Sequence, residues 1–222
     1  MSDVFVNEGL FSEERLGEID TYEEWNSEQI EEDRQALEEL WEKREGQIEE
    51  GLSEMETRYY WVSYVLRAMN FRYSVAELTP DFSEDIDFRP DFTLFPSSQV
   101  LENAIPHRGE REFYSQALGV MRAIGWSDDI DNYEAEDETY NVAYEVDRLV
   151  RSTGVQWGIV TNGELWRLYH RDTIGLLDTY YEINLIDALH GNDPEAFKYF
   201  WMVFSPVAMA GDGVQPIIER LL

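Results

Sequence analysis

Apolar positions recur with helical spacing in several parts of this chain. Between residues 27 and 50 they stand among charged residues, which predicts one long amphipathic helix. Residues 53–69, 141–152 and 194–204 show the same spacing, and Pro194 suits the first turn of the last helix. The apolar positions that define the first three helices are Ile30, Leu37, Leu40, Trp41 and Ile48, then Met55, Tyr59, Val62, Leu66 and Met69, then Val142, Val146, Leu149 and Val150. A short helix is also expected over residues 214–221.

Other segments have the composition of β-strands. Residues 153–170 contain two β-rich runs separated by Asn162-Gly163, a dipeptide that strongly favours a hairpin turn. Residues 112–126 fit either a helix or a buried strand, because their apolar positions keep helical spacing while residues 118–124 also form an apolar run. Further strands are expected at residues 71–76, directly after Asp91, and at residues 179–183.

The remaining segments have no clear period. Residues 1–22 mix apolar and acidic positions, and we expect them to form a tail that docks on the body of the protein. Residues 97–111 have the composition of turns. Residues 79–87 and 128–138 are expected to be acidic loops. These segments separate the predicted helices and strands without adding further elements.

The order of the predicted elements indicates the fold class. Helix, strand, strand, strand, helix, hairpin, strand and helix predict an α/β protein in which a mixed β-sheet is flanked by helices. The chain has 222 residues, a length that favours one domain with a substantial core. We expect residues 1–50 to be a tail and helix packed on that body, residues 51–204 to be the body itself, and residues 205–222 to be a C-terminal tail.

The chain is strongly acidic, with 47 acidic and 17 basic residues and a formal charge of −30. Because 43% of its residues are hydrophobic, we expect a folded protein with an acidic surface rather than a disordered one. Lys43 and Lys198 are its only lysines, a composition that resembles proteins of salt-loving archaea. At molar salt the Debye length is only ~3 Å, so surface repulsion is largely screened. Nucleic acid remains a candidate partner there, although the charge gives it no support.

The chain has no cysteine, so disulfides, thiolate metal sites and a cysteine nucleophile are excluded. The N-terminal residues lack the features of a signal peptide, and no window approaches the length of a membrane span. We therefore expect a soluble cytoplasmic protein without a membrane partner. His107, His170 and His190 are too scattered to predict a zinc site.

Two motifs resemble a known family. The run Thr-Gly-Val-x-Trp-Gly-x-x-Thr-Asn-Gly-x-x-Trp-Arg-Leu-Tyr at residues 153–169 is the specific one, and Arg89-Pro90-Asp91-Phe92 is the weaker one. With these motifs the chain resembles, over most of its length, the PD-(D/E)XK nuclease-like N-terminal region of type IIG restriction-modification enzymes and related phage-defence methylases, including haloarchaeal ones. The resemblance implies a restriction-endonuclease-like fold and a site for Mg²⁺.

The resemblance also implies which residues should form that site. In such domains an aspartate at the start of one strand and an acid on the next hold Mg²⁺, and a lysine two positions after the second acid positions the attacking water. Asp91 matches the aspartate, but the acid and the lysine fall on Arg122 and Ile124. We expect Arg122 to form an ion pair with Asp91 that fills the place of the metal.

Two further positions of the resemblance depart from its pattern. An acid expected on the first helix of the body falls near Arg58, although Glu54 and Glu56 are close in sequence. The glutamine of a Gln-x-x-x-Tyr element falls on Glu145, with Leu149 in place of the tyrosine. The sequence therefore predicts a degenerate site, composed of Asp91 and Glu145 with Arg122 and Ile124, and lost catalysis.

Three functions follow as alternatives. The first is an inactive nuclease-like domain that binds DNA through Arg89, Arg122 and Arg167, or that binds a companion methyltransferase, since the chain itself has no methyltransferase motif. The second is an active Mg²⁺-dependent endonuclease in which Glu145, Asp128 or Asp129 supplies the missing acid. The third is a protein-interaction module that uses residues 27–50 and the aromatic segment 199–204. Tryptophans that could stack on bases are expected in the core instead, namely Trp126, Trp157 and Trp166.

Overall fold

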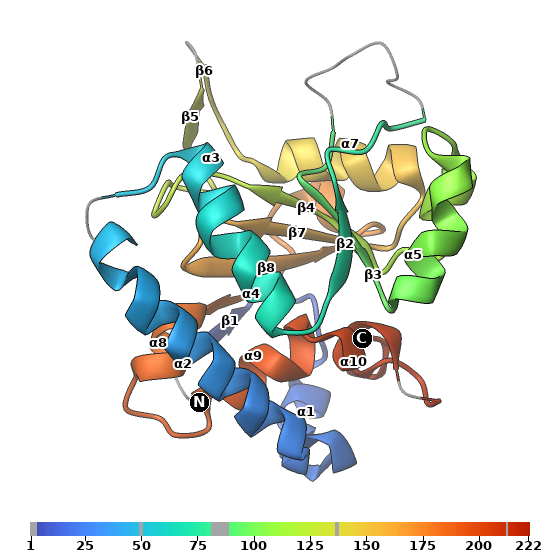
Figure 1. Cartoon of the computed structure of the whole chain (residues 1–222). Coiled ribbons are helices and arrows are strands. Elements are labelled where there is room, and N and C mark those ends of the chain that lie inside the picture. Colours follow the sequence, from blue (N-terminus) through green and yellow to red (C-terminus); the bar gives the residue numbers. More distant parts are fainter. Residues whose placement is uncertain (1–3, 49–50, 81–88, 136–137, 212) are drawn as a thin grey trace.

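The computed structural model describes residues 4–48, 51–80, 89–135, 138–211 and 213–222, and a seven-stranded sheet lies at its centre (Figure 1). The strand order is β1-β9-β8-β7-β4-β3-β2, and a separate pair is formed by β5 and β6. Only β4 and β7 pair in parallel within the large sheet, and its other neighbours are antiparallel. The predicted mixed α/β class with a helical N-terminal region is therefore confirmed. The strands are β1 (Phe5–Asn7), β2 (Arg72–Val75), β3 (Phe92–Phe95), β4 (Gly119–Ala123), β5 (Tyr133–Ala135), β6 (Glu138–Tyr140), β7 (Trp157–Thr161), β8 (Leu165–His170) and β9 (Tyr181–Asn184).

Helices cover both faces of the sheet (Figure 1). The α-helices are α1 (Glu13–Leu16), α2 (Glu28–Ile48), α3 (Glu54–Glu56), α4 (Ser63–Ala68), α5 (Ser98–Ala104), α6 (Arg111–Tyr114), α7 (Ala143–Thr153), α8 (Leu185–His190), α9 (Ala196–Phe204), α10 (Pro206–Ala210) and α11 (Ile217–Leu221). The π-helical segment η3 (Thr57–Val62) joins α3 to α4, and four 3₁₀ turns are η1 (Ile19–Thr21), η2 (Glu23–Asn26), η4 (Ile105–His107) and η5 (Ile174–Leu176). Among the described residues, no helix is long and apolar enough to cross a membrane.

The segment from α3 to α4 corresponds to the predicted helix at residues 53–69. It begins at Ser53, whose hydroxyl accepts a hydrogen bond from the backbone N–H of Glu56, while the Glu56 carboxylate accepts one from the N–H of Ser53. This capping box satisfies two donors that the first helical turn would otherwise leave unpaired. It fixes the start of the helix that carries Glu54 and Arg58.

The two faces of the sheet have separate cores. On one face α2, α4, α8 and α9 bury side chains against the sheet, including Trp61, Trp166 and Trp201. On the other face α5, α6 and α7 cover the strands, with Phe113 and Val146 among the buried residues. Trp157 and Trp166 are buried, as expected of core tryptophans, and Trp126 is half-buried between Trp41 and Trp61.

The predicted hairpin at residues 153–170 is present as β7 and β8. Asn162 and Gly163 lie in its loop, and the Asn162 side chain accepts hydrogen bonds from the N–H groups of Glu164 and Leu165. Gly163 has a φ of +94°, a conformation that glycine adopts without strain. A Cβ atom there would lie 2.4 Å from the ring of Trp126. The loop therefore needs glycine for both its conformation and its packing.

Several sequence expectations were wrong. Residues 5–7 dock on the body as expected, but they do so as edge strand β1, which pairs with β9 and was not predicted. Residues 97–111 contain α5 and the start of α6 instead of turns alone, because Ser97 caps the first of these helices. The expected acidic loop at residues 128–138 contains β5 and the start of β6. Of the two alternatives for residues 112–126, the buried strand is the one present, as β4. Most of the loop expected at residues 79–87 lies outside the described residues.

Candidate functional site

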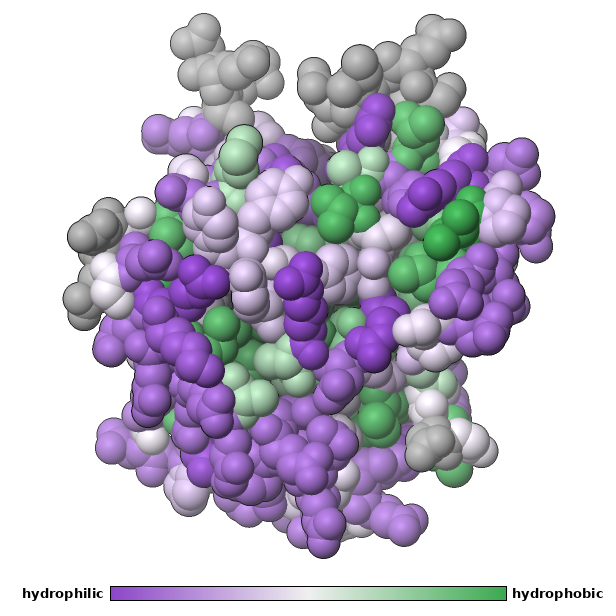
Figure 2. All heavy atoms as spheres, viewed as in Figure 1, coloured by the Kyte–Doolittle hydropathy of each residue, from purple (hydrophilic) through white to green (hydrophobic). Residues whose placement is uncertain are grey.

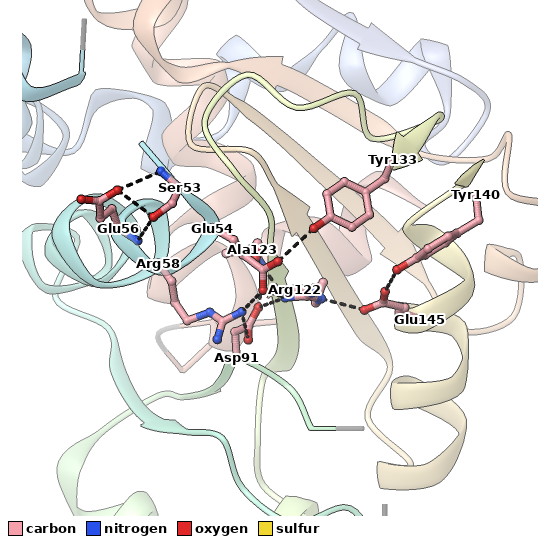
Figure 3. Close-up of polar contacts among 10 residues, drawn as sticks. All are labelled: Ser53, Glu54, Glu56, Arg58, Asp91, Arg122, Ala123, Tyr133, Tyr140 and Glu145. Atoms are coloured by element: carbon pink, nitrogen blue, oxygen red, sulfur yellow. Dashed lines mark hydrogen bonds and ion pairs between the residues drawn. The ribbon is translucent and has the colours of Figure 1, made fainter. Parts of the chain in front are cut away.

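Five charged side chains meet at one end of the sheet (Figure 3). Asp91 directly precedes β3, and Arg122 stands near the end of β4. Because β3 and β4 are antiparallel, these two positions lie at the same end. Glu54 and Arg58 come from the helical segment α3–η3, and Glu145 from the first turn of α7. We call these five residues the ion-pair cluster.

Arg122 is the centre of the cluster. Its Nη1 atom lies 3.0 Å from Asp91 Oδ2 and 2.8 Å from Glu54 Oε1, and its Nε atom lies 2.6 Å from Glu145 Oε2. Nη1 also donates to the carbonyl oxygen of Ala123, at 3.1 Å. The Arg122 side chain is only 15% exposed. One guanidinium therefore joins three carboxylates that come from three different parts of the chain.

Both oxygens of Asp91 are engaged. Oδ2 accepts a hydrogen bond from the backbone N–H of Ala123, at 2.7 Å, in addition to that from Arg122. Oδ1 lies 2.8 Å from Nη2 of Arg58, which also pairs with Glu54. The Asp91 side chain is 7% exposed. The predicted ion pair between Arg122 and Asp91 is thus present, and Arg58 adds a second one that the sequence did not predict.

The charges of the cluster nearly balance, since two guanidiniums face three carboxylates. Burial raises the pKa of Asp91, against the charges of Arg122 and Arg58, which lower it. Burial alone would lower the pKa of Arg122, but Asp91, Glu145 and Glu54 outweigh it and raise that pKa further above its ordinary value. The pKa of Glu54 is lowered, because the hydrogen bond and charge of Arg122 overcome the effect of burial. Arg122 is therefore a permanent cation in this site.

Two tyrosines from the β5–β6 pair complete the site (Figure 3). The hydroxyl of Tyr133 donates to Glu54 Oε2, at 2.9 Å, and that of Tyr140 donates to Glu145 Oε1. The two rings contact each other edge to face, with centroids 5.8 Å apart. Burial and the hydrogen bond to Glu54 raise the pKa of Tyr133 to about 12. The outer oxygens of both glutamates are thereby occupied by neutral donors.

The sequence analysis missed these tyrosines. Tyr133 lies in the segment expected to be an acidic loop and Tyr140 lies just after it, and the sequence there gave no sign of a strand pair. In the structure Tyr133 pairs with Tyr140 across β5 and β6, and cross-strand aromatic pairs of this kind stabilise a hairpin.

The cluster as arranged does not fit Mg²⁺. A hard dication requires free oxygen ligands, and those of Asp91 are taken by two guanidiniums and a backbone N–H. Arg122 also places its positive charge between the carboxylates, where it would repel a cation. Ile124 is fully buried in the core under α7, with Val120 on the same face of the sheet. Its aliphatic side chain provides no substitute for the expected lysine.

The other predicted site residues lie outside the cluster. Arg167 is only 4% exposed, pairs with Asp131 and Glu182, and stacks on the ring of Tyr180, 3.9 Å from its centroid. It therefore has no free face for a phosphate. Arg89 donates to the carbonyl oxygen of Ala76, at 3.3 Å.

The two aspartates proposed as substitute ligands also lie elsewhere. The carboxylate of Asp129 accepts hydrogen bonds from the backbone N–H groups of Asp131 and Asn132, so it caps a turn. Asp128 lies against Gly125, where a Cβ atom would meet its carboxylate at 2.4 Å. Among the described residues, neither aspartate forms a hydrogen bond or ion pair with the cluster. Of the candidates for a migrated acid, Glu145 alone is brought to Arg122.

The structure therefore unites Asp91, Arg122, Glu145, Glu54 and Arg58, and leaves Arg89 and Arg167 apart from them. Comparisons with protein-family models, with curated proteins and with solved structures find no match to this chain. Function consequently has to be argued from the cluster and from the surface of the molecule.

Proposed function

We propose that this chain is a nuclease-like domain of a restriction-modification or phage-defence system that does not cleave DNA and acts by binding DNA or a partner protein. One observation carries the proposal: Arg122 joins Asp91, Glu54 and Glu145 at the place where a nuclease of this type would hold its metal. A guanidinium in that place neutralises the carboxylates without activating water. The cluster is then a structural replacement for a catalytic centre.

The arrangement of the chain supports this proposal. The elements α3–α4, β2, β3, β4, α7 and β7 come in this order along the chain, with α5, α6 and the β5–β6 pair inserted between them. They give a helix, three antiparallel strands, a second helix and a strand parallel to the third. Three of the positions at which the sequence departs from the nuclease pattern, Arg58, Arg122 and Glu145, meet at one end of this unit. These three positions are spread from residue 58 to residue 145 in the sequence, and the fold brings them together. Their meeting at one site is what we expect if that site was remodelled as a whole.

Energetics also favour a fixed cluster. Breaking a buried ion pair by removing one partner costs about 3–5 kcal/mol, since the remaining charge is left without compensation. If a dication displaced Arg122, the Arg122 side chain would have to move out of the site. The buried Asp91 would then lose its ion pair with Arg122 and would have to rearrange. The domain is thus better suited to a constant structure than to reversible binding of a metal.

A competing function is an active endonuclease, and one specific observation favours it. Glu54, Asp91 and Glu145 converge on a single guanidinium, so rotation of Arg122 out of the site would leave three carboxylates around one space. This function requires the loss of all three of these ion pairs before catalysis. We therefore rank it second.

A cleavage assay separates the two functions. Supercoiled plasmid is incubated with the intact protein in 0.5 to 3 M KCl, with Mg²⁺ or Mn²⁺, beside the variant Asp91→Ala. We expect no nicking by either protein. Nicking by the wild type that disappears in Asp91→Ala would establish the endonuclease and overturn the proposal.

A binding assay tests the remaining part of the proposal. A fluorescent DNA duplex is titrated with the protein at the same salt concentrations, with Arg89→Gln as the variant and Arg151→Gln as the matched control on α7. Arg151 pairs with Asp147 on an exposed surface and lies far from Asp91 in the sequence. Weaker binding by Arg89→Gln alone would assign the duplex contact to the segment before β3. If no duplex binds, the proposal requires that the protein binds a partner instead. A pull-down from the native host should then recover a companion methyltransferase.

A further inference from the structure

A second surface, separate from the ion-pair cluster, has an unusual composition for this protein. A groove of about 460 Å³ lies between α2 and α4 and is lined by Ala36, Leu40, Lys43, Arg44, Tyr64, Arg67 and Ala68. Its lining contains three cations and no carboxylate, in a chain with 47 acidic and 17 basic residues. We call it the α2–α4 groove. Its charge is opposite to that of the protein as a whole.

Two of its arginines are not neutralised by acids. Arg44 donates to the side-chain oxygen of Gln47, and Arg67 donates to the hydroxyl of Tyr73. Within the part of the chain that the structure describes, neither forms an ion pair with a carboxylate. In this they differ from the arginines of the cluster and from Arg34 and Arg151, which do pair with acids. Their positive charge is available to an anion from solution.

Aromatic rings alternate with these cations. The guanidinium of Arg44 lies 4.8 Å from the ring centroid of Tyr64 and 6.0 Å from that of Tyr60, and that of Arg67 lies 5.3 Å from the ring of Tyr64. Tyr59, Tyr60 and Tyr64 are 42%, 50% and 37% exposed. On this face of the molecule, Figure 2 shows apolar and weakly polar surface over α2 and α4 beside strongly hydrophilic side chains. The surface thus offers flat rings and flat cations side by side.

Rings and unpaired cations together match one class of ligand. A single strand of nucleic acid presents bases that stack on aromatic and guanidinium planes, and phosphates that pair with cations. Duplex DNA hides its bases, and an acidic peptide has few rings to stack. Stacking also persists at the high salt that weakens ion pairs with phosphate. We infer that the α2–α4 groove binds single-stranded nucleic acid. Tyr64 in the groove and Tyr60 beside it, next to Arg44, stack on bases, and Arg44 and Arg67 contact the backbone.

This inference goes beyond the proposed function, because the groove shares no residue with the ion-pair cluster and requires no duplex. Fluorescence anisotropy tests it on the intact protein with three labelled probes: a thymidine 20-mer, a uridine 20-mer and a glutamate 20-mer peptide. Each is titrated at 0.5 and 2.5 M KCl. We expect one or both oligonucleotides to bind and the peptide not to bind, and the two oligonucleotides distinguish DNA from RNA.

Variants locate the contact. We expect Tyr60→Leu to weaken oligonucleotide binding at least about fivefold, the loss of one stacked base, and Arg44→Glu with Arg67→Glu to weaken it more. Arg151→Glu makes the same kind of charge change on α7 and should alter binding less than about twofold. Circular dichroism and thermal unfolding establish that each variant is folded. Tyr60 is half exposed, so its replacement by leucine leaves the core intact.

Three outcomes would overturn the inference: equal binding by wild type and groove variants, no binding of either oligonucleotide at both salt concentrations, or binding of the glutamate peptide in their place. The variant Arg89→Gln keeps this result separate from the proposed function. It is expected to change duplex binding and to leave single-strand binding unchanged, so failure of one proposal is distinguishable from failure of the other.

Discussion

The Arg122 guanidinium and the Asp91 carboxylate are 3.0 Å apart, and the second oxygen of Asp91 faces Arg58 at 2.8 Å. Asp91 therefore has two cationic partners, whereas Arg122 has three anionic ones. Because Arg122 has more partners than Asp91, removing Arg122 and removing the charge of Asp91 should lower the free energy of unfolding by different amounts. This asymmetry yields the first prediction.

Arg122→Met should destabilise the protein by about 3–5 kcal/mol, because it leaves buried carboxylates without their shared partner. Asp91→Asn should cost less, since the other two carboxylates still pair with Arg122 and the amide still accepts the N–H of Ala123. Urea unfolding followed by circular dichroism at 2 M KCl measures both values. Equal and small losses, below about 1 kcal/mol, would contradict a cluster that holds the site together.

The second prediction concerns alkaline pH. Burial raises the pKa of Tyr169 to about 12, and the pKa of Tyr133 is also raised to about 12, whereas an unfolded tyrosine titrates near its ordinary value of 10.0. Between these pH values the folded state holds protons that the unfolded state has lost, so stability falls as pH rises. For the buried Tyr169 a rise of this size corresponds to about 3 kcal/mol at most, and the partly buried Tyr133 contributes less.

Tyr169→Phe should flatten the loss of unfolding free energy between pH 10 and pH 12. The exposed Tyr144, 56% accessible, serves as the matched control in the variant Tyr144→Phe. Unfolding free energies at several pH values, with tyrosinate absorbance recorded in parallel, give the comparison. If the unfolding free energy of the wild type and of Tyr169→Phe fell equally steeply with pH, the raised pKa of Tyr169 would not be the cause of the loss.

The third prediction concerns a buried carboxylate that joins distant parts of the chain. Asp33 on α2 accepts hydrogen bonds from Trp201 Nε1 at 2.9 Å, from Gln29 at 2.8 Å and from Asn70 at 3.3 Å. Asp33→Ala leaves the buried indole N–H of Trp201 without a partner, and should cost at least about 2 kcal/mol. Glu38→Ala, on the same helix and paired at the surface with Arg34, should cost less than about 1 kcal/mol. Thermal unfolding checks both, and an Asp33→Ala variant as stable as Glu38→Ala would contradict this role.

The fourth prediction concerns the hairpin loop. Gly163→Ala places a Cβ atom 2.4 Å from the Trp126 ring at a φ of +94°, so strain and overlap add. We expect a loss of at least about 1–3 kcal/mol. Gly46→Ala on α2 is the control, because a Cβ atom there meets nothing within 4 Å and alanine favours helix. Chemical unfolding should show opposite signs for the two variants, and a neutral Gly163→Ala would refute the close packing.

Local patterns predicted the elements that local physics determines. The long helix α2 follows from its apolar spacing. The helical segment from α3 to α4 follows from apolar spacing and begins at a capping box. The β7–β8 hairpin follows from Asn162-Gly163. The meeting of Arg122 with Asp91 was predicted from the resemblance to the nuclease-like family, which also placed Glu145 at the same site. Strand β1 was missed because three residues have no detectable period and their pairing with β9 depends on tertiary structure. Tyr133 and Tyr140 were missed for the same reason, since only the folded chain brings them to Glu54 and Glu145.

The pairing of β1 with β9 has a consequence for biosynthesis. Phe5 leaves the ribosome long before its partner Ile183, because the residues between them are translated first. Strand β1 therefore cannot pair before β9 has been synthesised, and its edge position allows it to pair after the other strands have assembled. Strand β1 would then be synthesised long before its partner and be among the last strands to pair.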